Sequence, residues 1–242
     1  MNATSGAPTL PVDQPNNLLI FINELRKHLR ALLLGSVLVA FGVYFATPAI
    51  IGLVQKHLDQ QLAFFTVAEP FVAHAKMAFV ISLVILMPWI LFCFWKALAR
   101  PFKISKATTR WFVFFTCCLF YSGASFCYLI TLPFGIKFLL GFQSEQLQPV
   151  ISIGRFVTFV TMFVFAFGLI FELPIFMIFT AKVGICPRRT FEKNRRYAVL
   201  VISILAALLT PTPDIVNMLL MGGPLYLLFE SGIIILKMLK IP

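Results

Sequence analysis

Charged residues are scarce in this chain, and so are the patterns on which enzymes and metal sites depend. Only 12% of its 242 residues are charged, against about 25% in soluble proteins, so water is not its main solvent. The five cysteines have no CxxC spacing and the three histidines form no cluster, which argues against a metal site. The GxSxG, HExxH and phosphate-loop motifs are missing too. We therefore expect neither a soluble enzyme nor a metalloprotein, and no cofactor.

Apolar residues dominate instead, at 60% of the chain with a mean hydropathy of +0.94. Six apolar stretches approach the roughly 20 residues that a helix needs to cross a bilayer, and they leave no room for a second globular domain. We predict an all-α polytopic integral membrane protein with six transmembrane helices in one domain, residues 17–236. Residues 1–16 are predicted to be a flexible tail without a cleaved signal peptide, and 237–242 a short cytoplasmic tail. The predicted spans are 31–54, 77–94, 111–132, 156–181, 197–209 and 215–236.

Prolines and one short stretch shape these spans. Pro88 and Pro174 predict bends rather than ends, because neighbouring helices or water can satisfy the carbonyls that a proline frees. Pro133 predicts the end of the third span. The 13 residues of the fifth span reach about 20 Å, short of the ~30 Å hydrocarbon core, so local thinning of the bilayer or entry of water is expected. Residues 18–29 are predicted to form an interfacial helix that leads into the first span.

Lysine and arginine counts predict the orientation, because these residues favour the cytoplasmic side. The segments that would share one side with both termini hold 16 of them, and the other side holds four. Both termini are therefore predicted to be cytoplasmic. This orientation also explains the net charge of +11, since the charges stand at the ends of apolar spans rather than on one soluble face, so we expect no nucleic-acid partner. The four opposite cations are Lys56, Lys76, Lys137 and Arg155.

Two carboxylates fall inside apolar spans. Glu172 lies near the middle of the fourth span, where a charge costs about 2.5 to 3.5 kcal/mol on insertion scales. It is predicted to face a cavity or a partner, and a structural hydrogen bond to carbonyls freed by Pro174 is the alternative. Glu230 raises the same question in the sixth span, but Ser231 and Gly232 beside it equally fit close helix packing.

Two further carboxylates stand near span ends. Asp214 follows the turn at residues 210–213, where it would either cap the last helix or act in function. Glu24 precedes the first span, with Lys27 and His28 three and four residues on. A local helix ion pair is one interpretation. The other is a receptor carboxylate for a basic peptide, because one carboxylate accepts two parallel hydrogen bonds from an arginine guanidinium, a geometry that lysine cannot copy.

Seven groups of motifs follow one another between residues 23 and 230. They read N-E-L-R-K-H-L at 23–29, E-P-F at 69–71 with Lys76 after it, F-G at 167–168 with F-E-L-P at 171–174, R-R-Y at 195–197, T-P-D at 212–214, P-L-Y at 224–226 and F-E at 229–230. In this order and spacing the chain resembles the TatC family of the twin-arginine protein translocase. The resemblance implies a concave six-helix arrangement, which agrees with the predicted spans and with the short fifth span.

The resemblance also implies a patch that reads the paired arginines of signal peptides. Its implied residues are Glu24, Leu25, Arg26, Ser105 and Thr108. The family usually carries a second glutamate between the second and third spans, but residues 96–110 contain no acid, and the expected position falls near Ser105 or Lys106. Backbone carbonyls and hydroxyls, or a partner helix, would then replace it.

Two further sets of residues follow from the resemblance. The concave face around Glu172 would receive partner or signal helices, and Met218 replaces a residue that is polar in many relatives. The implied groove residues are Glu172, Pro174 and Glu230, and the implied extracytoplasmic cap and turn comprise Pro48, Glu69, Phe71 and Asp214.

The resemblance implies a core and receptor subunit without catalysis, which helps to export folded proteins at the expense of the proton motive force. Its implied partners are twin-arginine signal peptides, single-span proteins of the TatA and TatB kind, other TatC copies and membrane lipids. The expected location is the bacterial inner membrane, with an organellar membrane as the alternative.

Two other functions stay open from the residues alone. A proton-coupled secondary transporter of a small solute would use Glu172 and Glu230 as a relay, although we find no inverted pairing of broken segments. An intramembrane enzyme would need an activated nucleophile, and Ser122, Ser125 and the cysteines lack a buried histidine.

Overall fold

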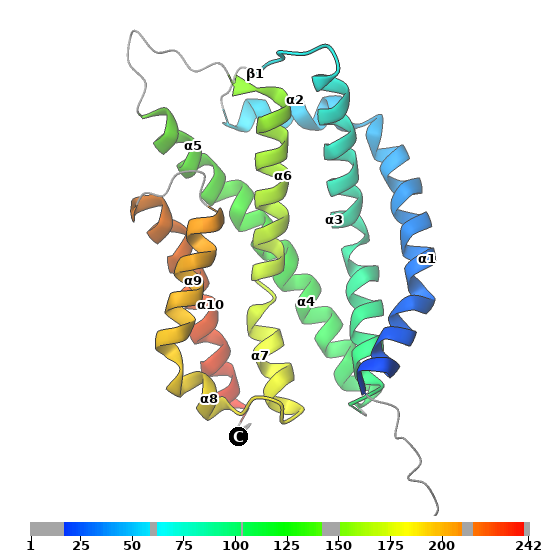
Figure 1. Ribbon diagram of the computed structural model, residues 1–242, viewed down its shortest axis with the longest axis vertical. Helices are drawn as coiled ribbons and strands as arrows, with labels where there is room; N and C mark the ends of the chain where they lie inside the picture. Colours follow the sequence, from blue (N-terminus) through cyan, green and yellow to red (C-terminus); the bar gives the residue numbers. More distant parts are fainter. Residues whose placement is uncertain (1–16, 59–61, 103, 142–150, 210–214, 240–242) are drawn as a thin grey trace, which may run out of the picture.

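The computed structural model describes residues 17–58, 62–102, 104–141, 151–209 and 215–239, and helices account for nearly all of this part of the chain (Figure 1). A single pair of two-residue parallel strands joins Leu62 to Ile151 and Ala63 to Ser152 within it. The elements are α1 (Asn17–Tyr44), α2 (Thr47–Leu58), β1 (Leu62–Ala63), α3 (Glu69–Ala99), α4 (Lys106–Phe126), η1 (Cys127–Thr131), α5 (Leu132–Leu140), β2 (Ile151–Ser152), α6 (Ile153–Ile170), α7 (Leu173–Lys182), α8 (Arg188–Lys193), α9 (Arg195–Leu209) and α10 (Ile215–Met238).

Four helical stretches in the described residues are long and apolar enough to cross a membrane. They are Glu69–Ala99, Lys106–Lys137, Ile153–Lys182 and Met221–Met238. A fifth is obtained when Leu29–Tyr44 and Thr47–Leu58, which meet at 70°, are taken as one broken span. Helix α9 has 15 residues, or about 22 Å, and is as short as the sequence predicts. The all-α membrane class is therefore confirmed, and the number of six spans stays a prediction.

The predicted first span, 31–54, falls on two helices that meet at a bend. α1 ends at Tyr44, and α2 leaves it at 70° across one end of the bundle (Figure 1). Pro48 in the first turn of α2 explains the break, since proline has no N–H to continue the ladder and disfavours the helical conformation of the residue before it. Thr47 donates its hydroxyl hydrogen to the Tyr44 carbonyl at 2.6 Å. Residues 18–29, predicted to be an interfacial helix that leads into the first span, are continuous with it as the first turns of α1.

The predicted stop of the third span at Pro133 is also wrong, because the helix continues to Leu140. The five residues of η1 form a π-helical turn just before this proline, and the Leu132 N–H donates to the carbonyl of Cys127, five residues back. Such a turn widens the helix and rearranges the hydrogen bonds that a proline would otherwise break.

As predicted, neither Pro88 nor Pro174 ends a span, while the predicted bend at Pro88 stays a prediction. α3 runs through Pro88 without a break. The fourth span breaks for two residues, Phe171 and Glu172, and resumes as α7 with Pro174 in its first turn. Proline is accepted there because the N–H groups of a first helical turn have no partner within the helix.

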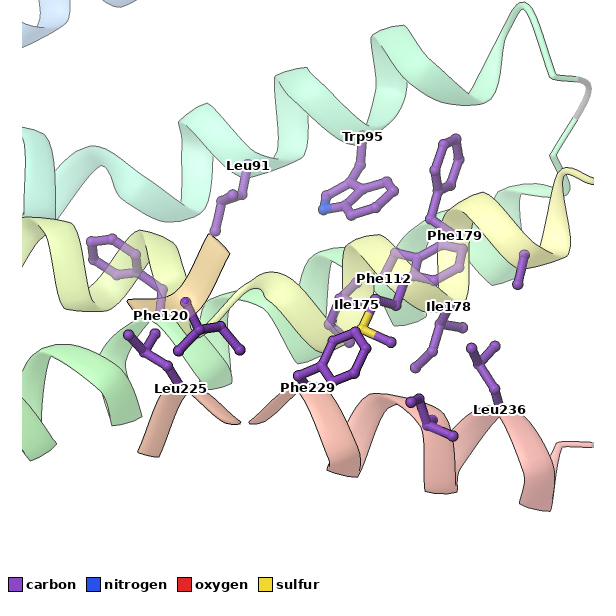
Figure 2. Packing of buried hydrophobic residues seen from close by; sticks show 14 of the residues in the cluster. Leu91, Trp95, Phe112, Phe120, Ile175, Ile178, Phe179, Leu225, Phe229 and Leu236 are labelled. Carbon is purple, nitrogen blue, oxygen red and sulfur yellow. The ribbon is translucent and has the colours of Figure 1, made fainter. Parts of the chain in front are cut away.

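Side chains of α3, α4, α7 and α10 form the main hydrophobic core (Figure 2). The Trp95 indole stacks on the Phe112 ring at 4.8 Å and meets the Phe179 ring edge-on at 5.2 Å. Phe229 of α10 closes the cluster from the other side. α1 packs on the outer side of α3, and α9 packs on α10. This core holds together helices whose ends carry the polar residues described next.

Candidate functional site

Lysines and arginines divide between the two ends of the bundle in the same two groups that the sequence analysis assigned to opposite sides. The beginning of α1, the turn between α3 and α4, α8 and the end of α10 lie together at one end (Figure 1), here named the basic end. α2, the two strands and the beginning of α6 lie at the other end. The described cations of the basic end are Arg26, Arg30, Lys96, Arg100, Lys106, Arg110, Lys182, Arg188, Arg189, Lys193, Arg195, Arg196 and Lys237.

The predicted signal-peptide residues of α1 lie in its first turns, within the basic end. Arg26 is exposed there. The side chains of Glu24, Leu25, Lys27 and His28 lie outside the described ones. Both interpretations of Glu24, the local ion pair and the receptor carboxylate, therefore stay predictions.

The two hydroxyl residues predicted to assist Glu24 cap α4. The Thr108 N–H donates to Ser105 Oγ at 3.3 Å, and the two hydroxyl oxygens lie 2.9 Å apart. Ser105 has the extended backbone that is usual at a helix N-cap. A pocket of 490 Å³ lies beside them and is also lined by Phe102 and Lys182. A bound peptide would have to share these hydroxyls with the helix cap.

Glu172 lies inside the packed bundle rather than on an open groove. Only 2% of it is exposed, and neither carboxylate oxygen has a hydrogen-bond partner within the described part of the chain. The alternative interpretation, a hydrogen bond to carbonyls freed by Pro174, is therefore not found there. Pro174 is buried, and Glu172 lies near Cys117 of α4. A partner helix would reach this carboxylate only if α7 and its neighbours separated.

Glu230 has two partners at the basic end. Arg195 Nη2 at the beginning of α9 donates to Glu230 Oε2 at 3.1 Å, and the Tyr226 hydroxyl donates to Oε1 at 2.9 Å. The prediction of close helix packing beside it is confirmed at Gly232, since a Cβ there would lie 2.8 Å from Met177 Sδ of α7. No hydrogen bond joins Glu230 to Glu172 among the described residues, so the geometry does not favour a relay between them.

At the opposite end, the residues of the predicted cap lie around the bend between α1 and α2. Pro48 is exposed in the first turn of α2. The exposed Phe71 ring meets the Tyr44 ring at 6.1 Å, which joins the beginning of α3 to the end of α1. Asp214 lies outside the described residues, so neither of its two interpretations is tested.

Glu69, the first residue of α3, joins α3 to the beginning of α6. The Phe65 N–H donates to Glu69 Oε2 at 2.8 Å, and the Ser152 hydroxyl and the Gly154 N–H, the latter at 3.1 Å, donate to Oε1. α3 has 31 residues and is about 46 Å long, longer than a ~30 Å hydrocarbon core, and Glu69 stands outside the predicted second span, 77–94. The hydrogen bonds from Ser152 and Phe65 lower the pKa of Glu69 to about 2.

Sequence reasoning missed the partners of Glu69. Ser152 caps α6 by accepting a hydrogen bond from the Arg155 N–H at 3.3 Å. A serine just before an apolar run is a usual N-cap signal, and it could have been found. The pairing of β1 with β2, which brings Ser152 to Glu69, could not, because two-residue strands have no sequence pattern.

Sequence reasoning also missed an apolar groove of 400 Å³ between α7, α8, α9 and α10, named here the α7–α10 groove. Two of these helices, α9 and α10, correspond to the predicted fifth and sixth spans. The described lining residues are Leu173, Met177, Cys186, Thr190, Phe191, Asn194, Tyr197, Ala198, Val201, Ile202, Leu205 and Phe229.

Comparison with known proteins gives one consistent result. The model of the family Sec-independent protein translocase protein (TatC) matches residues 21–224. The chain is 33% identical over 236 residues to the Sec-independent protein translocase protein TatC of Carboxydothermus hydrogenoformans, covering 94% of this chain and 96% of that one. It is 35% identical over 221 residues to TatC of Helicobacter pylori strain 26695, covering 90% and 87%.

The fold agrees with these likenesses. A crystal structure of the twin arginine translocase receptor TatC superimposes with a TM-score of 0.78 at 26% identity, and the likeness covers 90% of this chain and 98% of that one. A second structure of this receptor, in a maltoside detergent, gives the same TM-score at 25% identity. The chain therefore belongs to the TatC family and is a multi-pass membrane subunit of a Sec-independent protein translocase.

Proposed function

We propose that this chain is the receptor and assembly core of a twin-arginine translocase, with six spans and both termini in the cytoplasm of a bacterium. It binds twin-arginine signal peptides at its basic end and takes part in exporting folded proteins at the expense of the proton motive force, without catalysis of its own. The observation that carries the proposal is the likeness, over 90% of this chain, to a structure described as the receptor of that system. The distribution of cations between the two ends supports the orientation.

Glu24 is the residue on which the receptor function rests, because a carboxylate can hold an arginine guanidinium through two hydrogen bonds. Glu24→Ala is expected to abolish export of a twin-arginine cargo while the chain still accumulates in the membrane. The measurement is photo-crosslinking of a twin-arginine signal peptide to a photoreactive residue that replaces Arg26 or Ser105. The signal should fall about tenfold or more, since a lost charged hydrogen-bond partner costs on the order of 1.5 to 3 kcal/mol.

A matched control is Glu192→Gln in α8, which also removes a carboxylate at the basic end. Glu192 pairs with Arg188 at 3.1 Å within its own helix, so this change should leave export and crosslinking intact. Normal export by Glu24→Ala would refute the receptor role. Equal losses in both variants would attribute the effect to overall charge and would refute the role of Glu24 as well.

Single-span partners of the TatA and TatB kind are proposed to dock along α9 and α10. The α7–α10 groove supports this proposal, because its exposed lining is almost entirely apolar. A photoreactive residue at Val201, which lines the groove, should crosslink to such a partner. The same residue at Met162 on α6, which is also exposed, serves as the control, and equal crosslinking from both positions would count against the groove.

Glu172 is also proposed to take part in binding these single-span partners. Because its carboxylate is buried, it acts when the helices around it separate, and not as part of the exposed surface. The carboxylate is buried and unpartnered within the described structure, an arrangement that costs free energy and therefore needs a functional reason. Glu172→Ala should weaken crosslinking of single-span partners at Val201. Unchanged crosslinking would argue against this role.

A further inference from the structure

A pocket between the end of α3 and the beginning of α4 has a different chemistry from the arginine-binding patch predicted beside it. Its volume is 820 Å³. Four of its described lining residues are cations, namely Lys96, Arg100, Lys106 and Arg110, and of these Arg100 has a further interaction within the protein. We name it the α3–α4 pocket. A site for arginine side chains needs acceptors, whereas this wall presents donors.

No carboxylate occurs among the described residues that line the α3–α4 pocket. The described carboxylates of the basic end are engaged elsewhere, Glu192 with Arg188 and Glu230 with Arg195. Helix α4 adds to the positive field, because its N-terminus carries the partial positive charge of the helix dipole beside Lys106. The pocket is therefore suited to an anion.

Three of the four other described lining residues are apolar, so the anion should carry hydrocarbon. Phe92, Ala99 and Ile104 form this apolar part, Thr109 is the remaining described lining residue, and the Lys96 ammonium stands 5.7 Å from the centre of the Phe92 ring. The faces of the two helices stay apolar toward the middle of the bundle. Ile85 lies two turns before Phe92 on α3, Phe114 lies one turn after Arg110 on α4, and about half of each side chain is exposed.

We propose that the α3–α4 pocket binds the phosphate headgroup of an anionic phospholipid, with the acyl chains lying along Phe92 and Phe114. Cations at the end of membrane-crossing helices, next to exposed apolar surface, match an amphipathic anion with its phosphate at the membrane surface. A soluble acidic protein segment would match the cations but not the apolar faces that continue into the membrane. The proposal does not depend on the signal-peptide function.

The test uses the purified full-length chain in detergent and two lipids with brominated acyl chains, phosphatidylglycerol and phosphatidylcholine. Bromine quenches nearby tryptophan, and Trp89 and Trp111 lie beside Phe92 and Arg110 in the chain. Phosphatidylglycerol should quench at lower mole fractions than phosphatidylcholine. Lys96→Gln combined with Arg110→Gln should weaken the binding of phosphatidylglycerol about thirtyfold, because each cation near a membrane surface strengthens binding of anionic lipid about fivefold.

Two matched variants separate the pocket from general charge and from misfolding. Lys96→Arg with Arg110→Lys keeps both charges and should retain the preference for phosphatidylglycerol. Lys56→Gln with Lys137→Gln removes two cations at the opposite end of the bundle and should retain it as well. Equal quenching by both lipids, or an unchanged preference in the Gln double variant, would overturn the proposal. Displacement of the lipid by millimolar inorganic phosphate, or by an acidic peptide, would overturn the choice of a lipid.

Discussion

Arg195 at the beginning of α9 binds Glu230 in the last part of α10, with 3.1 Å between Nη2 and Oε2. The Tyr226 hydroxyl holds the other oxygen of the same carboxylate. This ion pair joins α9 to α10 at the basic end, beside the open α7–α10 groove. The carboxylate that the sequence singled out in the sixth span is thus a partner of α9.

A double-mutant cycle with Arg195→Gln and Glu230→Gln should give a coupling free energy of about 0.2 to 1 kcal/mol. The value is small because half of the Arg195 side chain is exposed, and it should shrink further in high salt as screening increases. Denaturant unfolding in detergent measures it. A coupling that does not change with salt would contradict a solvent-screened pair.

Thr116→Val should destabilise the core by about 1 to 3 kcal/mol, because it leaves the buried Trp95 N–H without an acceptor. The indole Nε1 now donates to Thr116 Oγ1 at 3.2 Å, and the threonine hydroxyl donates in turn to the Phe112 carbonyl at 2.8 Å. Thr116→Ser keeps the hydroxyl and is the control. The comparison is read from the unfolding midpoint and from tryptophan emission, and equal midpoints for the two variants would argue that the hydrogen bond does not contribute.

Gly123→Ala should also destabilise the protein by about 1 to 3 kcal/mol, the usual cost of overpacking a core. A Cβ at this position would lie 2.8 Å from the carbonyl oxygen of Phe167, so α4 and α6 would have to move apart. Gly42→Ala in α1 meets nothing within 4 Å and should be neutral or slightly stabilising, because alanine favours the helix. If thermal unfolding placed the two variants at the same midpoint, the close approach of α4 and α6 would be refuted.

Glu69 should give the cap at the α3–α6 junction a pH dependence at low pH. Its pKa is lowered to about 2 in the folded protein from an ordinary value of 4.5. The carboxylate therefore contributes stability above its unfolded pKa, and this contribution is lost as the pH falls through the folded pKa. Glu69→Gln should remove the dependence and speed hydrogen exchange at the Gly154 amide. An exchange rate unaffected by Glu69→Gln would mean that this junction does not rely on the carboxylate.

Glu172→Gln and Glu172→Leu should leave stability within about 1 kcal/mol of the native chain or raise it, because they remove a buried carboxylate that has no described partner. Export should nevertheless fall if the carboxylate serves partner binding. Unfolding midpoints and export rates are measured on the same variants, with Glu192→Gln as the neutral control. A marked loss of stability in Glu172→Leu would show instead that the carboxylate has a structural partner.

Much of the fold was predictable because proline and apolar length act locally. Breaks in the helices lie within one turn of Pro48 and Pro174. The predicted end at Pro133 failed because the π-helical turn at Cys127–Thr131 rearranges hydrogen bonds, and no local sequence signal marks such a turn. The bend of 70° between α1 and α2 was not predicted for a similar reason. Pro48 allows the helix to break at this point, but the packing of the helices decides the angle.

The candidate site likewise contains residues that the sequence could identify and contacts that it could not. The sequence alone could single out Glu24, Glu172 and Glu230, because a carboxylate in or beside an apolar span costs free energy whatever its partners are. The sequence could not tell that Glu230 meets Arg195, 35 positions earlier, or that Ser152 reaches Glu69 across 83 positions. Contacts between such distant residues depend on how helices pack.

The amino-acid sequence by itself determined the solvent of this protein, the lengths of its apolar helices, the two groups of cations and its family motifs, because hydropathy, charge and proline stereochemistry act residue by residue. Only the tertiary structure decided which carboxylates are paired, that Glu172 is enclosed, and that cations of α3 and α4 share one pocket. These properties depend on the distances between helices, and no single stretch of sequence contains them.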